Sequence, residues 1–405
     1  FVSPIIMVVV GLSNGLGAGV SSSISRRIGA RDKSGADNTT MHALLLTIIV
    51  SAILTIVLLY FLEPMLLTIG AGSALDLALE YGNIVFVGSI LIVFTNTAYA
   101  ILRGEGDTKR TMYAMGAGSL INAVLDPILI YWAGLGIAGA AWGTIISLFL
   151  VSAVQIYWLL IKKDTYVSLS RKAFVPSRGV MLDILQVGIP ASIEFLFYSI
   201  DAVIINAMLV RVSGTDAVAV YTAGWRVIFV ALVPLIAIAT AEISVAGAAF
   251  GARRYESLAV IHSYSTKLGL AIGLATALIT GLFAPQITAL FTFGPESAHL
   301  APTMVAFMHA MCLFYPFVSP GIMSASFFQG AGKGLTSLFL NLLRDVILVT
   351  MMAFVLGMVL GLGQEGIWWG IVFGNISGSL FAYLWAKLYI SRLMKDKGLS
   401  SVRKD

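Results

Sequence analysis

The chain has 405 residues, of which 59% are hydrophobic and only 11% are charged. Soluble globular proteins carry roughly 25% charged residues, and a soluble chain of this length could not keep so much apolar surface out of water. The composition therefore excludes a soluble enzyme and indicates a protein whose solvent is lipid. The single cysteine, Cys312, leaves no intrachain disulfide.

Eleven apolar segments are long enough to cross a membrane as helices, because a spanning helix needs about 20 mostly apolar residues. The clearest of them reads ALLLTIIVSAILTIVLLYF and has no charged residue. All are continuous apolar runs, whereas the strands of a membrane β-barrel alternate apolar and polar residues. We therefore expect an all-α membrane protein, with spans at 4–24, 43–62, 82–102, 112–132, 137–161, 184–210, 217–249, 268–291, 302–328, 335–360 and 367–390.

Nearly all of the 25 lysines and arginines lie in every second connection between these segments and in the tail. The opposite connections carry mainly acids, such as Glu63, Asp76 and Glu80. By the positive-inside rule the basic loops are cytoplasmic, so the C-terminus is inside and Phe1 is outside. This distribution accounts for the net charge of +5 without a nucleic-acid partner. We expect a multi-pass protein of the cell membrane.

The second half of the chain repeats motifs of the first half in the same order. SRRIGARDKSGA (25–36) is similar to GAAFGARRYESLA (247–259), and two further pairs of motifs follow at nearly the same separation along the chain. Each pair falls on a basic loop or an equivalent helix start, which indicates parallel repeats related by an axis along the membrane normal. The glycines that pair are Gly29 with Gly251, Gly104 with Gly330, and Gly139 with Gly366.

The repeat predicts two pseudo-symmetric helix bundles of unequal size. The N-lobe (1–161) has five spans and the C-lobe (182–391) has six, with a cytoplasmic linker (162–181) between them and a basic cytoplasmic tail (392–405) after them. Residues 182–222 have no partner in the first half. We therefore expect a twelfth span, the first of the N-lobe, to precede Phe1; the alternative is a naturally asymmetric protein of eleven helices.

An ordered set of motifs resembles the MATE (multidrug and toxic compound extrusion) family. It comprises SRRIGARDKSGA (25–36), LRGEGDT (102–108), NAVLDPILI (122–130), GLGIAGAAWGT (134–144) and GIPASIE (188–194). The resemblance implies two six-helix bundles that face each other as a V and open alternately to each side. It also implies export of amphipathic, often cationic compounds in exchange for protons or sodium.

Asp126 is the strongest candidate for chemistry within the spans. A carboxylate inside a spanning helix costs several kcal/mol unless it is paired, hydrated or protonated. Asn122 lies four residues earlier on the same helix face, and Pro127 leaves the Ala123 carbonyl without its helical donor. These oxygens suit a hard cation such as Na⁺, or could hold a proton. The alternative is an acid that only locks two helices together.

The spacing of Asn122 and Asp126 most resembles the archaeal branch of the family, in which this helix supplies a cation site in the N-lobe. Carried over by position, the resemblance adds Tyr81, Asn96 and Thr144 to that site. Ordinary hydrogen bonding between helices is the alternative role for these three residues.

The chain departs from the family pattern in two places. The first family helix, which carries an acid of the cation site, is absent. The span at 302–328 also lacks the acid that a sodium-coupled bacterial branch places there, so a C-lobe cation site is not expected. The sequence contains no HExxH, P-loop or CxxC motif, which gives no support to another metal site, a cofactor or an enzyme.

Candidates for a substrate site lie in the second half of the chain. Glu194 and Asp201 are seven residues apart on one helix face, and Glu242 lies on the next span. Phe314 and Tyr315 belong to a cluster of aromatic and methionine side chains that would suit apolar cations. The alternative is that the acids are neutralised structurally and that the aromatics face lipid or core.

The leading hypothesis is a cation-coupled antiporter that exports organic compounds as a monomer; the sequence leaves open both the substrate and the choice between proton and sodium. The runner-up is a flippase for a lipid-linked precursor, from the same wider superfamily, whose cavity tends to carry several cations to meet a phosphate. Acids outnumber cations within the spans, and an acidic cavity favours cationic cargo. The cations are Arg226 and Arg344, and the acids are Asp126, Glu194, Asp201, Glu242 and Asp345.

Overall fold

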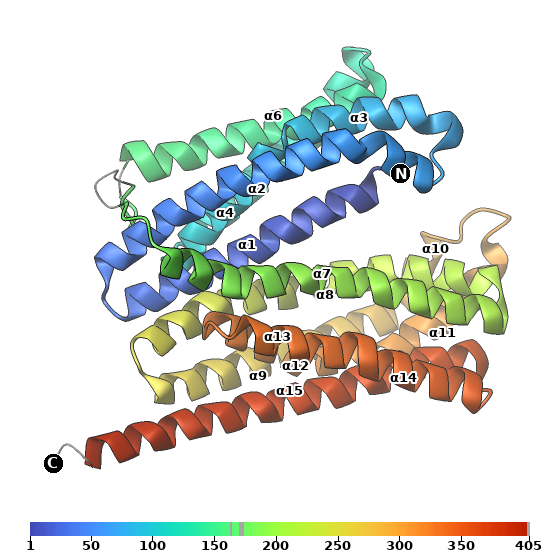
Figure 1. The fold of residues 1–405 in the computed structure, drawn as a ribbon. Helices are drawn as coiled ribbons and strands as arrows, with labels where there is room; N and C mark the ends of the chain where they lie inside the picture. Colours follow the sequence, from blue (N-terminus) through green and yellow to red (C-terminus); the bar gives the residue numbers. More distant parts are fainter. Residues whose placement is uncertain (163, 170–173, 403–405) are drawn as a thin grey trace. The chain divides into compact units, whose positions relative to one another are not determined.

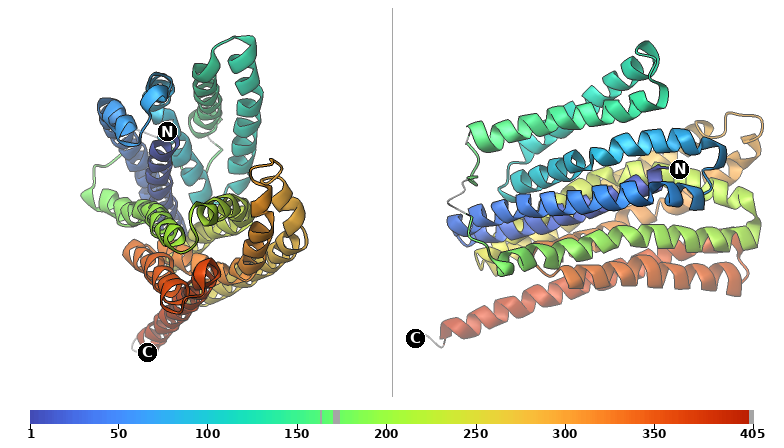
Figure 2. Two further views of the ribbon diagram at one scale, coloured as in Figure 1. Left: turned by 90° about the vertical axis from the view of Figure 1, so that its right-hand side faces the viewer. Right: turned by 45° about the horizontal axis from the view of Figure 1, so that its top comes forward.

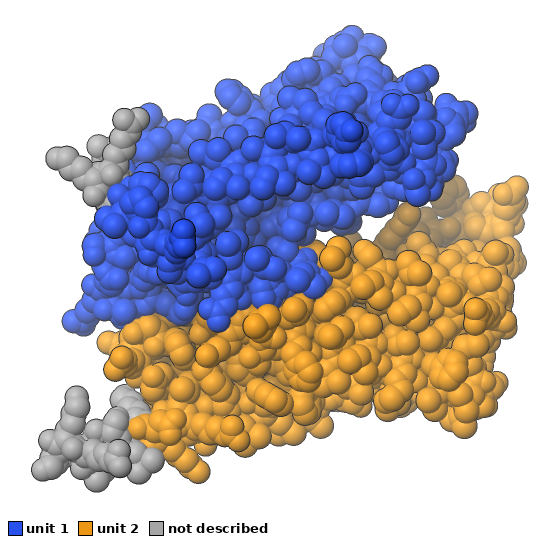
Figure 3. Space-filling model, viewed as in Figure 1, with its two compact units in different colours: residues 1–193 blue, residues 194–405 orange. Residues whose placement is uncertain are grey.

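The computed structural model describes residues 1–162, 164–169 and 174–402, and every regular element among them is helical. The chain divides into two compact units (Figure 3): unit 1 comprises Phe1–Ile193 and unit 2 comprises Glu194–Asp405. The expected all-α membrane fold is therefore confirmed, since each long helix satisfies its backbone hydrogen bonds internally, as a lipid solvent requires.

Unit 1 is built around α4, which packs against α1, α2 and α6. A second group forms where α6 also packs against α3 and α5; the helices of both groups run side by side in Figures 1 and 2. Its helices are α1 (Ser3–Gly29), α2 (Lys33–Thr68), α3 (Leu75–Val87), α4 (Ser89–Gly104), α5 (Thr108–Pro127), α6 (Gly136–Ile156) and the part of α7 (Arg178–Ser213) up to Ile193.

Unit 2 is built around α12, which packs against α8, α9, α13 and α15. Its buried aromatic and aliphatic side chains form the core of the unit. The helices are the remainder of α7, α8 (Thr215–Gly251), α9 (Tyr255–Leu282), α10 (Ala284–Ala289), α11 (Ala301–Met311), α12 (Phe314–Gly330), α13 (Gly334–Asn341), α14 (Val349–Phe354) and α15 (Gly363–Val402).

Among the described residues, nine helices are long and apolar enough to cross a membrane. Two further candidates are bent pairs of helices: Gly72–Val87 with Ser89–Gly104, bent by 46°, and Ala298–Met311 with Phe314–Gly330, bent by 48°. If each bent pair is one span, the total is eleven, which is the number predicted from the sequence. The predicted span at 268–291 is displaced, because α9 already begins at Tyr255 and ends at Leu282.

The internal repeat extends to unusual backbone conformations. Arg31 and Arg253, which have the same separation as the paired glycines Gly29 and Gly251, both have positive φ angles, of 59° and 54°. Such angles are uncommon outside glycine. The two halves therefore repeat a chain path as well as a sequence.

Further backbone features recur in the second half of the chain. The paired features are separated along the sequence by the same number of residues as Gly139 and Gly366, or nearly so. The five-residue π-helical segments Ile128–Trp132 and Val355–Val359 form one such pair. Glycines with positive φ form others: Gly106 with Gly332, Gly134 with Gly361, and Gly136 with Gly363.

The beginning of α7 is held closely against α1 in unit 1. A Cβ atom at Gly19 would lie 2.9 Å from the Gly188 backbone nitrogen, and one at Gly15 would lie 2.7 Å from the Gly188 carbonyl oxygen. Only glycine fits such a close crossing, which is typical of membrane helices. The Ser192 hydroxyl, which donates to the Gly188 carbonyl at 2.9 Å, belongs to the same crossing.

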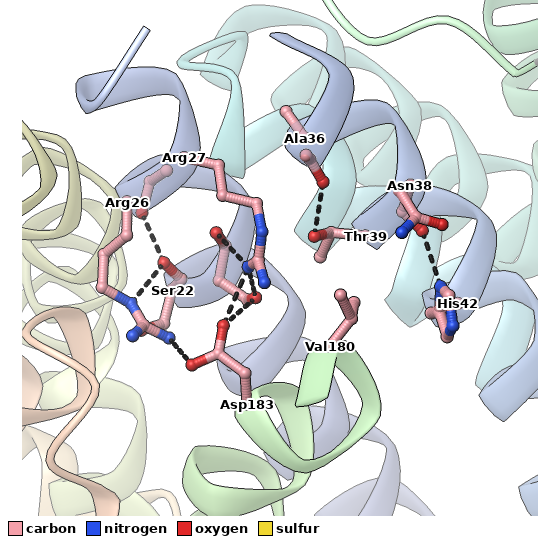
Figure 4. A network of polar contacts seen from close by, with 12 residues as sticks. Ser22, Arg26, Arg27, Ala36, Asn38, Thr39, His42, Val180 and Asp183 are labelled. Carbon is pink, nitrogen blue, oxygen red and sulfur yellow. Dashed lines mark hydrogen bonds and ion pairs between the residues drawn. The ribbon is translucent and has the colours of Figure 1, made fainter. Parts of the chain in front are cut away.

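Near this crossing, Asp183 of α7 binds two arginines at the end of α1. Its carboxylate oxygens lie 2.8 Å from Arg26 Nη2 and 2.8 Å from Arg27 Nη1 (Figure 4). The Ser23 hydroxyl donates to the same carboxylate at 2.6 Å. These charge-assisted bonds fix the start of α7 to unit 1.

The linker, meaning residues 164–169 and 174–177, lies along unit 1 and is bonded mainly through its backbone N–H groups. The Val167 N–H donates to Glu105 at 3.1 Å and the Ser168 N–H donates to Asp37 at 2.7 Å. Further along, the Ser177 N–H donates to His42 Nε2 at 3.1 Å. The described part of the linker is therefore attached to unit 1 at several points.

Glu105 should make the attachment of the linker dependent on pH. Burial raises the pKa of its carboxyl to about 7, although the Val167 N–H opposes the shift. Because the folded pKa exceeds the unfolded value, this group favours folding at low pH and loses that advantage as pH rises towards 7. Between pH 5 and pH 8, the melting temperature of the Glu105→Gln variant should fall less than that of the parent. The difference should be about 2–4 °C for each kcal/mol by which ionisation of Glu105 lowers the parent's free energy of unfolding.

Thermal unfolding in detergent at the two pH values measures this difference. Glu80→Gln, a change at an exposed glutamate of α3, is the matched control and should follow the parent. Equal pH dependence of the parent and Glu105→Gln would contradict the expectation.

Candidate functional site

Asp126 and Asn122 lie near the end of α5, and the structure brings their side chains together. The Asn122 amide donates to Asp126 Oδ1 at 3.0 Å, from four residues earlier. Pro127, which has no N–H to donate, ends the α-helix, and a π-helical segment follows at Ile128–Trp132. Such segments frequently occur at functional sites, and this one begins directly beside the acid.

Helix α6 covers the other side of the Asp126 carboxylate. A Cβ atom at Gly143 would collide with Asp126 Oδ1, so the carboxylate lies directly against the α6 backbone. The next residue, Thr144, donates its hydroxyl to the Ala140 carbonyl at 3.1 Å. The Tyr81 phenol of α3 lies within hydrogen-bonding reach of Thr144 and close to the charge of Asp126. Three helices therefore contribute to one cluster of oxygen atoms.

Asn96 of α4 is oriented differently from the rest of the predicted set. Its amide donates to the Ile92 carbonyl at 3.1 Å, back along its own helix. The assignment of all five residues to a cation site stays a prediction from the resemblance, but Asn122, Tyr81 and Thr144 lie near the Asp126 carboxylate, whereas the Asn96 amide is bonded along its own helix.

The cluster around Asp126 has the chemistry of a site for a hard cation or a proton. Its donors are a carboxylate, an amide and two hydroxyl groups, and hard cations prefer such oxygen ligands. The Asn122 amide nitrogen already donates to the carboxylate, which leaves the amide oxygen free to turn towards a cation. The arrangement could equally hold a proton on Asp126, with Asn122 as its neighbour.

Unit 2 does not repeat this cluster, although it repeats the backbone that carries it. At the separation that pairs Gly139 with Gly366, the equivalents of Asp126 and Gly143 are Ala353 and Gly370. A Cβ atom at Gly370 would collide with the Ala353 backbone, so the close helix contact is the same. The methyl group of Ala353 offers no oxygen ligand, and the two lobes therefore differ in chemistry at this position.

Unit 2 holds Glu194 in a hydrogen-bonded network instead. The Ser337 hydroxyl donates to Glu194 Oε1 at 2.8 Å, and the Gln329 amide donates to Oε2 at 3.0 Å. These donors come from α13 and α12. Glu194, which the sequence suggested as a substrate contact, therefore has both carboxylate oxygens occupied by neighbouring helices.

Arg344 and Asp345 form a bidentate ion pair beside this network. Arg344 Nε and Nη2 lie 2.7 Å and 2.9 Å from the two carboxylate oxygens of Asp345. Arg344 is only 3% exposed, and a Cβ atom at Gly321 or Gly378 would collide with its side chain. The guanidinium is thus neutralised and enclosed, as expected for a packing pair.

The other predicted substrate residues have contrasting surroundings. Asp201 lies on α7, and its Oδ1 atom is buried without a hydrogen-bond partner among the described residues. Phe314 and Tyr315 are 4% and 0% exposed, with the Phe314 ring 5.7 Å from that of Trp225. Both aromatics lie in the core of unit 2, and their role in substrate binding stays a prediction.

The sequence did not single out several residues that complete these polar groups. Gly143 leaves space for the Asp126 carboxylate. Gln329 and Ser337 donate hydrogen bonds to Glu194, and His262 pairs with Glu242 at 3.0 Å. Glycine adjacent to a motif residue is a weak signal, and the other contacts join helices that are far apart in sequence. Only the repeat, which places Gly143 opposite Gly370, could have indicated a close helix contact there.

The fold and these polar groups define a membrane transporter built from two helical lobes. Residues 1–128 and 190–361 match the MatE family model, so the chain belongs to the MATE family. It is therefore a multi-pass transporter of small molecules.

Curated relatives support this assignment. A FAD transporter of Shewanella oneidensis is 28% identical over 360 residues, which cover 87% of this chain and 78% of the relative. The multidrug export protein MepA of Staphylococcus aureus is 24% identical over 402 residues, covering 97% of this chain and 85% of the relative.

Solved structures agree with the fold of the chain. A MATE transporter crystallised with MaL6 has a TM-score of 0.94 at 39% identity and covers 97% of this chain and 88% of its own. A transporter of the MOP superfamily from Pyrococcus furiosus has a TM-score of 0.94 at 40% identity, covering 96% of this chain and 87% of its own.

Gly143→Ala should disable the Asp126 site without removing the acid. The new methyl group needs the space that Asp126 Oδ1 occupies, so the carboxylate must turn away from Asn122. We expect gradient-driven transport to fall at least about tenfold, which corresponds to about 1.4 kcal/mol. Transport assays in proteoliposomes measure this.

The matched control is Gly116→Ala on α5, where the added methyl group meets open space. It should transport like the parent protein. Full transport by a Gly143→Ala variant that elutes as a folded protein would show that the position of the Asp126 carboxylate against α6 does not matter for transport.

Proposed function

We propose that this transporter exports amphipathic organic cations by alternating access, in exchange for protons or sodium, and that Asp126 binds the coupling ion. The observation that carries the proposal is the Asn122–Asp126 pair, hydrogen-bonded at 3.0 Å within a spanning helix. Acids within membrane spans mark ion pathways by default. The Tyr81 and Thr144 hydroxyls beside this pair add the oxygen ligands that a coupling ion needs.

The charges of unit 2 favour a cationic cargo over a phosphate. Arg344 already donates from Nε and Nη2 to the two carboxylate oxygens of Asp345, so it has little capacity to bind a phosphate. Asp201 is an acid of the same unit with an unpartnered oxygen among the described residues, and acidic surroundings favour cations. Multidrug export by MepA, a relative over nearly the whole chain, is consistent with such a cargo.

The alternative cargo is a molecule that carries phosphate, as a lipid-linked precursor does. Arg226 is an exposed cation on α8, and one relative is a FAD transporter; FAD contains a diphosphate. A phosphate cargo would need more than one free cation to offset its charge. We therefore place this function second.

Asp126→Asn should abolish the response to the driving ion. The amide preserves the size and the hydrogen bond to Asn122 but carries no charge to bind a cation and no acid to release a proton. The assay follows transport of a fluorescent organic cation in proteoliposomes that contain the parent protein. A pH gradient and a sodium gradient are imposed in separate experiments, and the gradient that drives transport identifies the coupling ion. The variant should lose that transport.

Normal insertion and folding of Asp126→Asn serve as the control for this experiment. Full gradient-driven transport by the variant would remove Asp126 from the coupling site. Transport of a diphosphate compound, with no transport of organic cations by the parent, would instead favour the alternative cargo.

We further propose that the protein lies in the plasma membrane as a monomer with its basic loops and C-terminus in the cytoplasm. In a Cys312→Ala background, Lys395→Cys should resist a membrane-impermeant thiol reagent added to intact cells, whereas Asp76→Cys should react. The reason is the positive-inside distribution of lysine and arginine. Both positions are exposed in the structure, so a reversed labelling pattern would reverse the topology.

A further inference from the structure

A buried acid and a buried histidine, Glu242 and His262, face each other inside unit 2. Glu242 of α8 and His262 of α9 are 2% and 1% exposed. Glu242 Oε1 and His262 Nδ1 lie 3.0 Å apart. A hydrogen bond of this length requires one proton between the two atoms, and that proton can belong to the carboxyl group or to the ring.

The opposite ring nitrogen shows which protonation states fit. His262 Nε2 faces the Ser324 hydroxyl of α12 at 3.5 Å. Ser324 already donates its single hydrogen to the Pro320 carbonyl at 2.6 Å, so towards His262 it can only accept. With the Ser324 hydrogen placed on the Pro320 carbonyl, the compatible arrangement has the ring hydrogen on Nε2, and a neutral ring then has a bare Nδ1.

Two states satisfy both contacts, and both contain the same number of protons. Either Glu242 is a neutral acid that donates to Nδ1, or Glu242 is a carboxylate that accepts from a fully protonated imidazolium. A pair with one proton fewer, and with its ring hydrogen still on Nε2, would place a carboxylate against a bare ring nitrogen. The geometry is thus that of the proton-loaded form of the pair.

We propose that Glu242 and His262 form a proton-binding site in unit 2, which holds one proton in the hydrogen bond between Glu242 Oε1 and His262 Nδ1. The site is separate from Asp126, which lies in unit 1. It deepens the proposed export function by adding a second protonation step, but the binding of this proton does not depend on the identity of the cargo.

The surroundings of the pair favour binding of a single proton that can be released. Ser265 lies close to the Glu242 carboxyl, but Oε2 has no hydrogen-bond partner among the described residues. Such a carboxylate is costly in a dry interior, which favours the loaded form. From α15, the Tyr383 ring packs 5.5 Å from the His262 ring and carries the Lys387 amine 5.2 Å from its own centre, so the charged group nearest on that helix is a cation.

Release of the proton would change a contact within α12. When the proton leaves, the remaining ring hydrogen must move from Nε2 to Nδ1 to preserve the bond to Glu242. Nε2 is then an acceptor, and the Ser324 hydroxyl can turn its hydrogen from the Pro320 carbonyl to Nε2. Pro320 precedes Gly321, against which Arg344 packs.

Infrared difference spectroscopy of the purified full chain in lipid tests the site directly. A step from pH 5 to pH 9 should remove the signal of a protonated carboxyl group or of an imidazolium from the parent protein. Glu242→Gln should lose this component, because the amide can still donate to Nδ1 but cannot titrate. His262→Gln should also lose or shift this infrared component. If one of the two variants folds poorly, the other still tests the site.

The controls separate this site from the coupling site in unit 1. Asp126→Asn and Glu63→Gln, a change at an exposed glutamate, should both keep the Glu242–His262 signal. A parent spectrum that is unchanged by both Glu242→Gln and His262→Gln would overturn the proposal, even if Asp126→Asn abolished transport. Loss of the signal in Glu242→Gln would support the proposal even if Asp126→Asn transported normally.

Transport supplies a readout that a purely structural pair would not change. Glu242→Gln mimics the loaded state, so we expect proton-driven export to fall about tenfold or more, equivalent to about 1.4 kcal/mol, and its pH profile to flatten. The matched histidine control is His309→Gln, whose parent ring contacts the Gly281 carbonyl at an exposed position. A pH profile identical to that of the parent in Glu242→Gln would count against release of the proton during transport.

Discussion

Lipid supplies no hydrogen-bond partners, so a polar group within a spanning helix of this protein depends on neighbouring helices for its contacts. Close helix contacts at glycine meet this requirement at several sites. Gly143 lets the α6 backbone approach Asp126, and Gly321 and Gly378 leave room for Arg344 between α12 and α15. Larger side chains at these positions would separate the helices, and the polar groups between them would lose their neighbours.

The internal repeat shows how one backbone can carry two kinds of chemistry. The π-helical segments and the glycine turns that follow them recur at the same separation in both halves of the chain. Within this common frame, Asp126 corresponds to Ala353, whereas Arg344 and Asp345 correspond to Ala117 and Gly118. The polar groups thus lie at different positions along equivalent helices, and the two lobes carry different chemistry on a common backbone.

Features that depend on neighbouring residues could be predicted from the sequence. Apolar runs predicted the spans, and helical spacing predicted that Asn122 would lie beside Asp126. The bend between Val87 and Ser89 was not predictable, because both arms are apolar and hydropathy does not report direction.

Contacts between helices also could not be predicted from the sequence. The bonds of Asp183 to Arg26 and of Glu194 to Ser337 join residues that are far apart along the chain. Such contacts depend on the rotation of each helix about its axis. Apolar residues all around a spanning helix leave that rotation unspecified, since the hydrophobic pattern does not mark a single buried face.

The intramembrane acids differ most in the partners that compensate their charge. Asp345 has the bidentate guanidinium of Arg344, and both oxygens of Glu194 accept hydrogen bonds. Packing between helices holds the partners of both carboxylates in place. Asp126 has a neutral amide as its hydrogen-bond donor, and Glu242 has a histidine that can itself titrate. Weak compensation is what allows a buried acid to exchange a proton or a cation. Asp201, whose Oδ1 atom has no hydrogen-bond partner among the described residues, is weakly compensated too, but only Asp126 and Glu242 have a hydrogen-bonded neighbouring side chain that could share a proton or a cation with them, which is why we propose these two as binding sites.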